Sequence, residues 1–228
     1  MLQKLNNKKL KTQNSLNKSI ADIRKDYSLH TLNEADVASD AIEQFERWWN
    51  DAMNSEIPEV NAMTLATATK NARPSARIVL LKGFNENGFV FYTNYESHKG
   101  KELEENPCAA LTFFWKEIER QIRIEGEVEK ISAEESEAYF LSRPEGSRIS
   151  AWASPQSNVI ESRELLEANT QHYKEEFKNS IPRPPHWGGY RVMPLKIEFW
   201  QGRTNRLHDR IQYTKTAEGS WKVERLAP

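Results

Sequence analysis

The stretch Arg120–Ile131, RQIRIEGEVEKI, decides the fold class because apolar and polar residues alternate along it. In an extended chain Ile122, Ile124 and Val128 lie on one face, and the glutamine, arginine and glutamate side chains lie on the other. A strand with one apolar and one polar face is typical of an antiparallel sheet that covers a core on one side. The stretch therefore predicts a half-buried antiparallel strand.

Other predicted strands precede and follow this one at short intervals. The sequence NENG (85–88) is a hairpin signal between two of them. The predicted strands cover 62–70, 75–84, 89–94, 108–115, 120–131, 190–202 and 220–228, and the predicted helices cover 35–54, 97–105, 132 to near Pro144, and 161–180. Because few helices separate successive strands, we expect a mainly β fold with flanking helices, arranged as an antiparallel barrel rather than a doubly wound sheet.

Two smaller expectations follow from local patterns. In the helix predicted over 35–54, helical spacing places Val37, Ile42, Phe45, one of the two tryptophans and Met53 on the apolar face. Cys108 begins the apolar run CAALTFFW, so we expect it to be a buried small hydrophobic residue. As the single cysteine, it excludes a disulfide within the chain.

Composition limits the class of protein. The 228 residues include 32 Lys and Arg against 33 Asp and Glu, a net charge of −1, which argues against a general nucleic-acid binder. No apolar run is long enough to span a membrane, and the Lys- and Asn-rich start lacks the apolar core of a secretory signal. We therefore expect a cytoplasmic protein with a mobile tail at 1–20 and a single domain at 21–228.

The segment Phe199–Arg210, FWQGRTNRLHDR, concentrates positive charge in this nearly neutral chain. If the chain is extended after Asn205, then Arg206, His208 and Arg210 share one face, and Leu207 with Asp209 takes the other. Such a row suits an anionic, planar ligand. A solvated edge strand with scattered charges is the alternative that the segment alone leaves open.

Further cations stand at the ends of predicted elements. Arg77 and Lys82 bound an apolar strand, and Ser97, His98 and Lys99 open a predicted helix, where free N–H groups and the helix dipole favour an anion. Solvated strand ends and ordinary helix capping explain these residues equally well.

A third group suits a phosphate. Tyr139 and Arg143 are four residues apart at the end of a predicted helix, and Ser147 follows the Pro144 turn, so together they form a plausible phosphate clamp. A solvent-facing helix end is the alternative. Phosphate-binding glycine loops and a nucleophile elbow are absent from the sequence, and its five histidines are not at metal-ligand spacing, so we expect no metal.

The combination of motifs is more specific than any of them alone. RIVLLK, FYTN, RQIRIEGEVEK, AYFLSRPEGSRISAWASPQS, WGGYRV, IEFWQGRTNRLHDR and the terminal VERLAP occur in this order. The chain resembles the pyridoxine/pyridoxamine 5′-phosphate oxidase family from about Arg24 to Pro228. This resemblance implies an FMN-binding split β-barrel that works as a homodimer, with FMN in a cleft between the subunits.

The resemblance also implies roles for individual residues. The implied FMN contacts are Arg77, Ile78, Val79, Leu80, Leu81, Lys82, Tyr92, Thr93, His98, Lys99, Gln121, Gln156, Ser157, Trp200 and Arg210. The implied substrate contacts are Arg24, Tyr27, Lys82, Tyr139, Arg143, Ser147, Arg206, Leu207 and His208. Of these, Arg206 and His208 would face the substrate ring as catalytic residues, and Arg24 and Tyr27 would belong to a segment that closes over the site.

The chain departs from the family at one cofactor position. His98 stands where the family usually has arginine, next to Lys99 at the expected FMN phosphate. An imidazole loses its charge near neutral pH, whereas a guanidinium does not. This difference puts the strength of FMN binding in question, but not the reaction.

The reaction implied is an oxidation of phosphorylated B6 vitamers. Pyridoxamine or pyridoxine 5′-phosphate would lose a hydride from C4′ to FMN, O2 would accept the electrons, and pyridoxal 5′-phosphate and H2O2 would form. The alternatives are another split-barrel flavoprotein, such as a flavin reductase, and a non-catalytic binder of pyridoxal phosphate. A flavin reductase would not need the second phosphate clamp at Tyr139, Arg143 and Ser147.

Overall fold

The computed structural model of the chain describes residues 20, 22–23, 25–178 and 180–228. The predicted tail and Arg24 therefore lie outside the described residues, except for Ile20 at the end of the tail. Each described helix is too short or too polar to cross a membrane.

Within the described part of the chain, nine strands form one antiparallel sheet, as the alternation in Arg120–Ile131 predicts. The strands are β1 (Ala62–Ala68), β2 (Pro74–Leu80), β3 (Gly83–Asn85), β4 (Gly88–Asn94), β5 (Cys108–Trp115), β6 (Arg120–Lys130), β7 (Trp187–Gln201), β8 (Asp209–Lys215) and β9 (Trp221–Arg225). The predicted hairpin is confirmed, because Asn85 pairs with Gly88 across the turn. The predicted strand over 75–84 is divided into β2 and β3.

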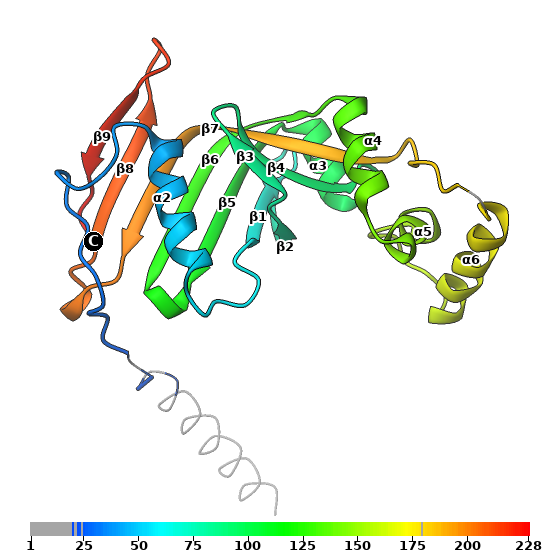
Figure 1. The fold of residues 1–228 in the computed structure, drawn as a ribbon, viewed down its shortest axis with the longest axis horizontal. Coiled ribbons are helices and arrows are strands. Elements are labelled where there is room, and N and C mark those ends of the chain that lie inside the picture. Colours follow the sequence, from blue (N-terminus) through cyan, green and yellow to red (C-terminus); the bar gives the residue numbers. More distant parts are fainter. Residues whose placement is uncertain (1–19, 21, 24, 179) are drawn as a thin grey trace, which may run out of the picture.

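The long strand β7 divides the sheet into two arms. One edge of β7 pairs with β6 along its length, whereas the other edge pairs first with β4 and then with β8. Between Glu125 and Gly126 the β6–β7 register shifts by one residue, which leaves Leu195 of β7 unpaired as a bulge and bends β7 where the two arms separate. A Cβ at Gly126 would lie 2.1 Å from the carbonyl oxygen of Met193, so the bend requires glycine. In Figure 1, β8 and β9 diverge to the left while β4 and β3 curve to the right. The fold is a mainly antiparallel split β-barrel with flanking helices.

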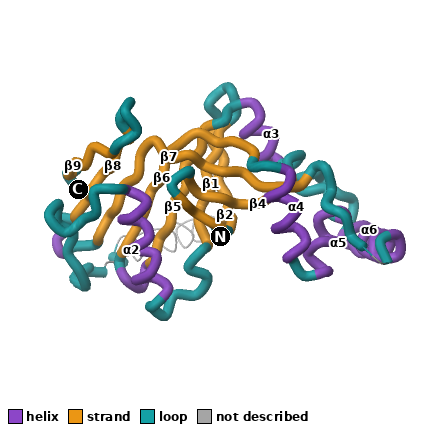
Figure 2. The backbone as a smooth tube through the Cα atoms, turned by 45° about the horizontal axis from the view of Figure 1, so that its top comes forward, coloured by secondary structure: helices purple, strands orange, loops and turns teal. Residues whose placement is uncertain are grey.

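The described helices are α2 (Ala41–Met53), α3 (His98–Glu105), α4 (Ala133–Ser142), α5 (Glu145–Ala153) and α6 (Arg163–Glu176), with short 3-10 turns η1 (Lys116–Ile118) and η2 (Thr204–Arg206). Helix α2 lies across one face of the sheet, and α4, α5 and α6 lie beyond one end of it (Figures 1 and 2). Phe45 of α2 anchors the core, with ring centroids 4.8 Å from Phe89 and 5.5 Å from Phe113.

Several sequence predictions were wrong in detail. Helix α2 begins after its cap Asp40, whose side chain accepts two backbone N–H groups, and not at Ala35. Met53 is 58% exposed because Ala52, one residue earlier, takes the buried position. Cys108 is exposed, since alternation along β5 places it on the outer face with Phe114. Helix α5 was not predicted, because its short sequence carries no clear helical period.

Candidate active site

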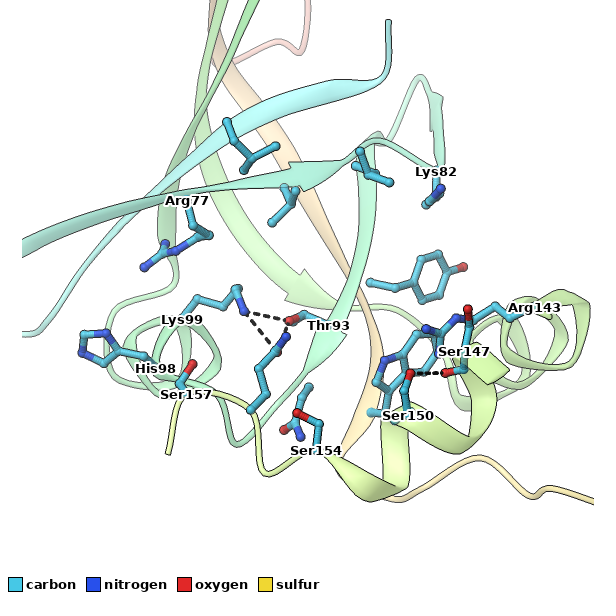
Figure 3. Close-up of a pocket in the computed structure, with 18 of the residues that line it drawn as sticks. Arg77, Lys82, Thr93, His98, Lys99, Arg143, Ser147, Ser150, Ser154 and Ser157 are labelled. Carbon is cyan, nitrogen blue, oxygen red and sulfur yellow. Dashed lines mark hydrogen bonds between the residues drawn. The ribbon is translucent and has the colours of Figure 1, made fainter. Parts of the chain in front are cut away.

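A cavity of about 980 Å³ opens between β2, β4, α3 and the α4–α5 corner (Figure 3). This volume is at the upper end of the range for small-molecule sites, roughly 300–1,000 Å³. Its walls carry Arg77, Lys82, Lys99 and Arg143, and none of the described residues that line it is an aspartate or glutamate. A cavity with four cations and no carboxylate, in a chain of net charge −1, is built for anions.

The cations gather at two ends of the cavity. Figure 3 shows Arg77, His98 and Lys99 at one end, and Lys82 and Arg143 at the other. Most of the predicted cofactor and phosphate residues line this cavity: Arg77, Ile78, Val79, Leu80, Lys82, Tyr92, Thr93, His98, Lys99, Tyr139, Arg143, Ser147, Gln156 and Ser157. The structure therefore brings together residues from 77 to 157 that sequence spacing could not connect.

Lys99 lies at the centre of the first end. Its side chain is buried, and its ammonium group donates hydrogen bonds to Thr93 (3.1 Å), Ser97 (3.2 Å) and Gln156 (3.2 Å). Burial, followed by the charge of nearby Arg77, lowers the pKa of Lys99 to about 8. An anion bound at this end would oppose that effect and raise the pKa of Lys99 again.

Glu102 is a buried carboxylate behind this end that sequence reasoning missed. It accepts hydrogen bonds from Ser75 and from Arg77 (3.2 Å), and it lies 3.6 Å from Nε2 of His98. Burial alone would raise the pKa of Glu102, but hydrogen bonds from Thr67 and Ser75 outweigh it and the pKa is lowered. The i, i+4 spacing from His98 was the available sequence signal. Glu102 therefore fixes the position of the Arg77 guanidinium, and its carboxylate lies within ion-pair distance of the His98 ring.

The second end is formed by the corner between α4 and α5. Arg143 is the C-cap residue of α4. Pro144 is the N-cap residue of α5 and has no capping side chain, so no cap side chain accepts a hydrogen bond from the first backbone N–H groups of α5. Ser147 lies in that first turn. Nη1 of Arg143 is buried without a hydrogen-bond partner among the described residues, and burial lowers the pKa of this guanidinium. The corner presents an unpaired cation and a helix start to the same space.

A stack of aromatic rings supports this corner. Tyr92 and Tyr139 stack with centroids 3.9 Å apart, and the ring of Trp187 is nearly parallel to both. The guanidinium carbon of Arg143 lies 4.5 Å from the centre of the Trp187 ring. Burial raises the pKa of Tyr92 to about 12, so its hydroxyl stays protonated. Trp187 was not predicted as a site residue, although it begins the WGGYRV motif.

Four predicted cofactor residues lie outside this cavity, and three of them form one row across the sheet. Gln121 of β6 pairs with Trp200 of β7, and Trp200 pairs with Arg210 of β8. Leu81 is the fourth: its side chain is buried and lines a different cavity, beside Trp49.

Three of the predicted substrate residues, Tyr27, Arg206 and His208, line part of a cavity of about 380 Å³ near η2. The prediction that the chain is extended after Asn205 was wrong. Asn205 and Arg206 have φ of 54° and 62°, and β8 begins only at Asp209. This tight turn breaks the alternation, so Arg206 and Arg210 do not share a strand face, and Leu207 is 69% exposed.

His208 is held in one orientation. Its Nδ1 accepts the backbone N–H of Arg203 at 3.0 Å, and its ring centroid lies 4.6 Å from that of Trp200. Burial, followed by the charge of Arg206, lowers the pKa of His208. The neutral ring therefore carries its proton on Nε2, which is the nitrogen available to a ligand.

The comparisons with known proteins show the family of the chain. The family model described as "Pyridoxamine 5'-phosphate oxidase" matches residues 49–176, more than half of the chain. The chain belongs to the pyridoxamine 5′-phosphate oxidase family. A second family model, "Pyridoxine 5'-phosphate oxidase C-terminal dimerisation region", matches residues 187–228, which include β7, β8 and β9.

Relatives of this family cover nearly the whole chain. The chain is 58% identical to the pyridoxine/pyridoxamine 5′-phosphate oxidase of Burkholderia lata over 212 residues, which are 92% of this chain and 99% of that protein. It is 55% identical to the protein of the same name from Trichormus variabilis, over 93% of this chain and 100% of that one.

Solved structures of the family share the fold. PhzG from Burkholderia lata, solved in complex with tetrahydrophenazine-1-carboxylic acid, superposes with a TM-score of 0.82 at 32% identity and covers 88% of this chain and 100% of its own. A pyridoxamine 5′-phosphate oxidase-related, FMN-binding protein from Nostoc punctiforme superposes with a TM-score of 0.66 at 18% identity, over 84% of this chain and 100% of its own, which indicates a common fold.

Proposed function

We propose that this chain is an FMN-dependent oxidase that converts pyridoxamine 5′-phosphate and pyridoxine 5′-phosphate to pyridoxal 5′-phosphate. The electrons go to O2, which becomes H2O2, and the amine substrate also consumes water and releases ammonia. The names of relatives 55–58% identical to this chain support the substrate class. The proposal places the chain in vitamin B6 metabolism.

The observation that carries the proposal is the cavity with two cationic ends and no carboxylate on its described walls. The cofactor and the substrate each bring one phosphate, with a charge of about −1.5 to −2 at neutral pH. Arg77, His98 and Lys99 suit the FMN phosphate, with Gln156 and Ser157 beside them. Lys82, Tyr139, Arg143 and Ser147 suit the substrate phosphate. A flavin reductase has no need of this second end.

The residues of the cavity fit FMN on their own chemistry. The buried ammonium of Lys99 has only neutral hydrogen-bond partners, so an anion would compensate its charge, and the apolar side chains of β2 line the space between the two ends. When bound, FMN supplies the acceptor for the hydride from C4′ and passes the electrons on to O2. The protein's part is position: Arg143 and Ser147 fix the substrate phosphate and thereby the place of C4′.

Arg206 and His208 complete the site if a second copy of the chain supplies them. In Figure 1 the strand β8 that follows them lies at the opposite side of the molecule from α4 and α5. We infer a homodimer in which the row Gln121, Trp200 and Arg210 of one subunit closes the FMN cavity of its partner. The match of residues 187–228 to a dimerisation region supports this arrangement. Neutral His208 would then donate from Nε2 to the substrate and orient it, and we assign no general base.

The outer face of the sheet suits such a dimer. Ile78 of β2 and Phe114 of β5 are 65% and 52% exposed. Ile78 pairs with Thr64 of the neighbouring strand β1. Phe114 pairs with Gln121 of the predicted cofactor row. These exposed apolar side chains fit a face that the second subunit would cover in the proposed homodimer.

Anaerobic reduction tests the proposal. The purified protein should be yellow, and pyridoxamine 5′-phosphate added without oxygen should bleach it; readmitted O2 should restore the colour and yield H2O2 and pyridoxal 5′-phosphate. A flavin reductase would be bleached by a nicotinamide cofactor instead. A non-catalytic binder would take up the vitamer with its colour unchanged, and either result would refute the proposal.

A further inference from the structure

Glu198 is a buried carboxylate on β7 with no role in the site described so far. Its residue is 6% exposed, and it lies two positions before Trp200. In the register of the sheet it stands between Arg123 of β6 and Gln212 of β8. A buried carboxylate is costly unless cations and hydrogen bonds compensate it, so its partners indicate its purpose.

Those partners are two arginines, of which Arg210 is held more closely. Nε of Arg210 donates to Oε1 of Glu198 at 2.8 Å, and Nη2 donates to Oε2 at 3.1 Å. Arg123 reaches the same carboxylate through one longer bond of 3.3 Å, and its side chain is 43% exposed. The two-point contact fixes the plane of the Arg210 guanidinium, which a single bond does not.

A backbone carbonyl completes the hold on Arg210. Nη1 donates to the carbonyl oxygen of Ala227 at 2.6 Å, and the N–H of Leu226 donates to the carbonyl oxygen of Arg210 at 2.9 Å. An arginine has five N–H donors, and Glu198 and Ala227 take three of them. Two donors, one on Nη1 and one on Nη2, remain for a ligand in a fixed direction.

We propose that Glu198 is the positioning residue that aims Arg210 at the flavin. This inference rests on the proposed function, in which Arg210 contacts FMN. Glu198 touches neither flavin nor substrate and acts through the guanidinium alone. Its effect should therefore vanish when Arg210 is replaced, whereas a merely structural ion pair would affect stability and leave the affinity for FMN unchanged.

Titration of the apoprotein with FMN, followed by quenching of flavin fluorescence, tests the inference without relying on turnover. Glu198→Gln should raise the Kd for FMN about tenfold, the lower end of the loss seen when a group that orients a ligating side chain is removed. In the Arg210→Gln background the same change should alter Kd by less than twofold. Arg123→Gln is the matched control, because it removes the other partner of Glu198 and leaves the two-point contact intact.

A second variant covers the case in which Glu198→Gln does not fold. Arg210→Lys keeps the charge beside Glu198 but loses the planar fork, so it should also bind FMN about tenfold more weakly. Wild-type affinity in Glu198→Gln or in Arg210→Lys would overturn the inference, as would equal losses from Glu198→Gln with and without Arg210. Tighter binding in Glu198→Gln would show that the carboxylate acts as an opposing charge, and it too would overturn the inference. If the wild-type protein bound no FMN, the proposed function itself would fail.

Discussion

Arg143 is a cation whose surroundings keep it free for a ligand. It packs on the ring of Trp187, and among the described residues it has no ion-pair partner. Arg143→Ala should therefore raise KM for pyridoxamine 5′-phosphate by about one to two decades, because a charge-assisted hydrogen bond contributes roughly 1.5–3 kcal/mol. Steady-state kinetics measure this. Arg143→Lys, which keeps the charge but not the fork, should fall between; an unchanged KM in Arg143→Ala would remove Arg143 from the clamp.

His208 gives the site a dependence on pH. Burial and Arg206 lower the pKa of His208, so the folded chain holds the neutral ring while the unfolded chain binds a proton near pH 6.5. The stability that this neutral ring contributes is present above about pH 6.5 and is lost as the pH falls through the lower folded value. Arg206→Met should raise the pKa of His208 by removing one cause of the shift. NMR titration of the ring measures this, and an unshifted or lower value would show that Arg206 does not act on His208.

His98 is the residue at which the chain departs from its family. It is 66% exposed and pairs with Glu102 at 3.6 Å, at the edge of the cavity near Lys99. We expect His98→Arg to tighten FMN binding, more at pH 8 than at pH 7, because arginine keeps its charge at both values. Dissociation constants for both proteins at both pH values measure this. Equal constants and equal slopes would mean that Glu102 holds His98 away from the phosphate.

At the scale of elements, the clamp depends on where α4 begins and ends. Ser132 caps α4 in a reciprocal box with Glu135, and the same helix carries Tyr139 and ends at Arg143. Ser132→Ala should cost about 1 kcal/mol in the free energy of unfolding. Urea unfolding measures the loss. Ser162→Ala is the matched control, since Ser162 precedes α6 without capping its backbone, and it should change little. An equal loss from both variants would contradict the assigned cap.

At the scale of the whole molecule, we expect the outer sheet face to complete the site in the proposed homodimer. Phe114 is 52% exposed and pairs with Gln121 of the predicted cofactor row. Phe114→Asp should convert a dimer to monomers and weaken FMN binding, because a charge would be buried in the interface. Sedimentation and FMN titration measure both effects. Val159→Asp, a charge on a fully exposed loop residue, should change neither. A Phe114→Asp protein that stayed dimeric would place the interface elsewhere.

The sequence by itself determined many, but not all, of the elements of this protein. Alternation in β6, the turn at Asn85–Gly88 and the cap at Ser132 are local properties, because they depend on a few neighbouring residues. Motif order also indicated the family, which the comparisons confirmed. The prediction of an extended chain after Asn205 was wrong, because Asn205 and Arg206 adopt left-handed backbone conformations within a stretch whose residues alternate as in a strand.

Only the tertiary structure decided which residues share a space. Lys99 meets Gln156 and Arg143 meets Trp187 because α3, the α4–α5 region and the start of β7 converge at one end of the sheet, and no local period encodes those contacts. Glu102 and Glu198 read as ordinary surface charges in the sequence. Burial made them partners of Arg77 and Arg210, because a carboxylate removed from water requires a cation beside it, and only the folded chain brings that cation near.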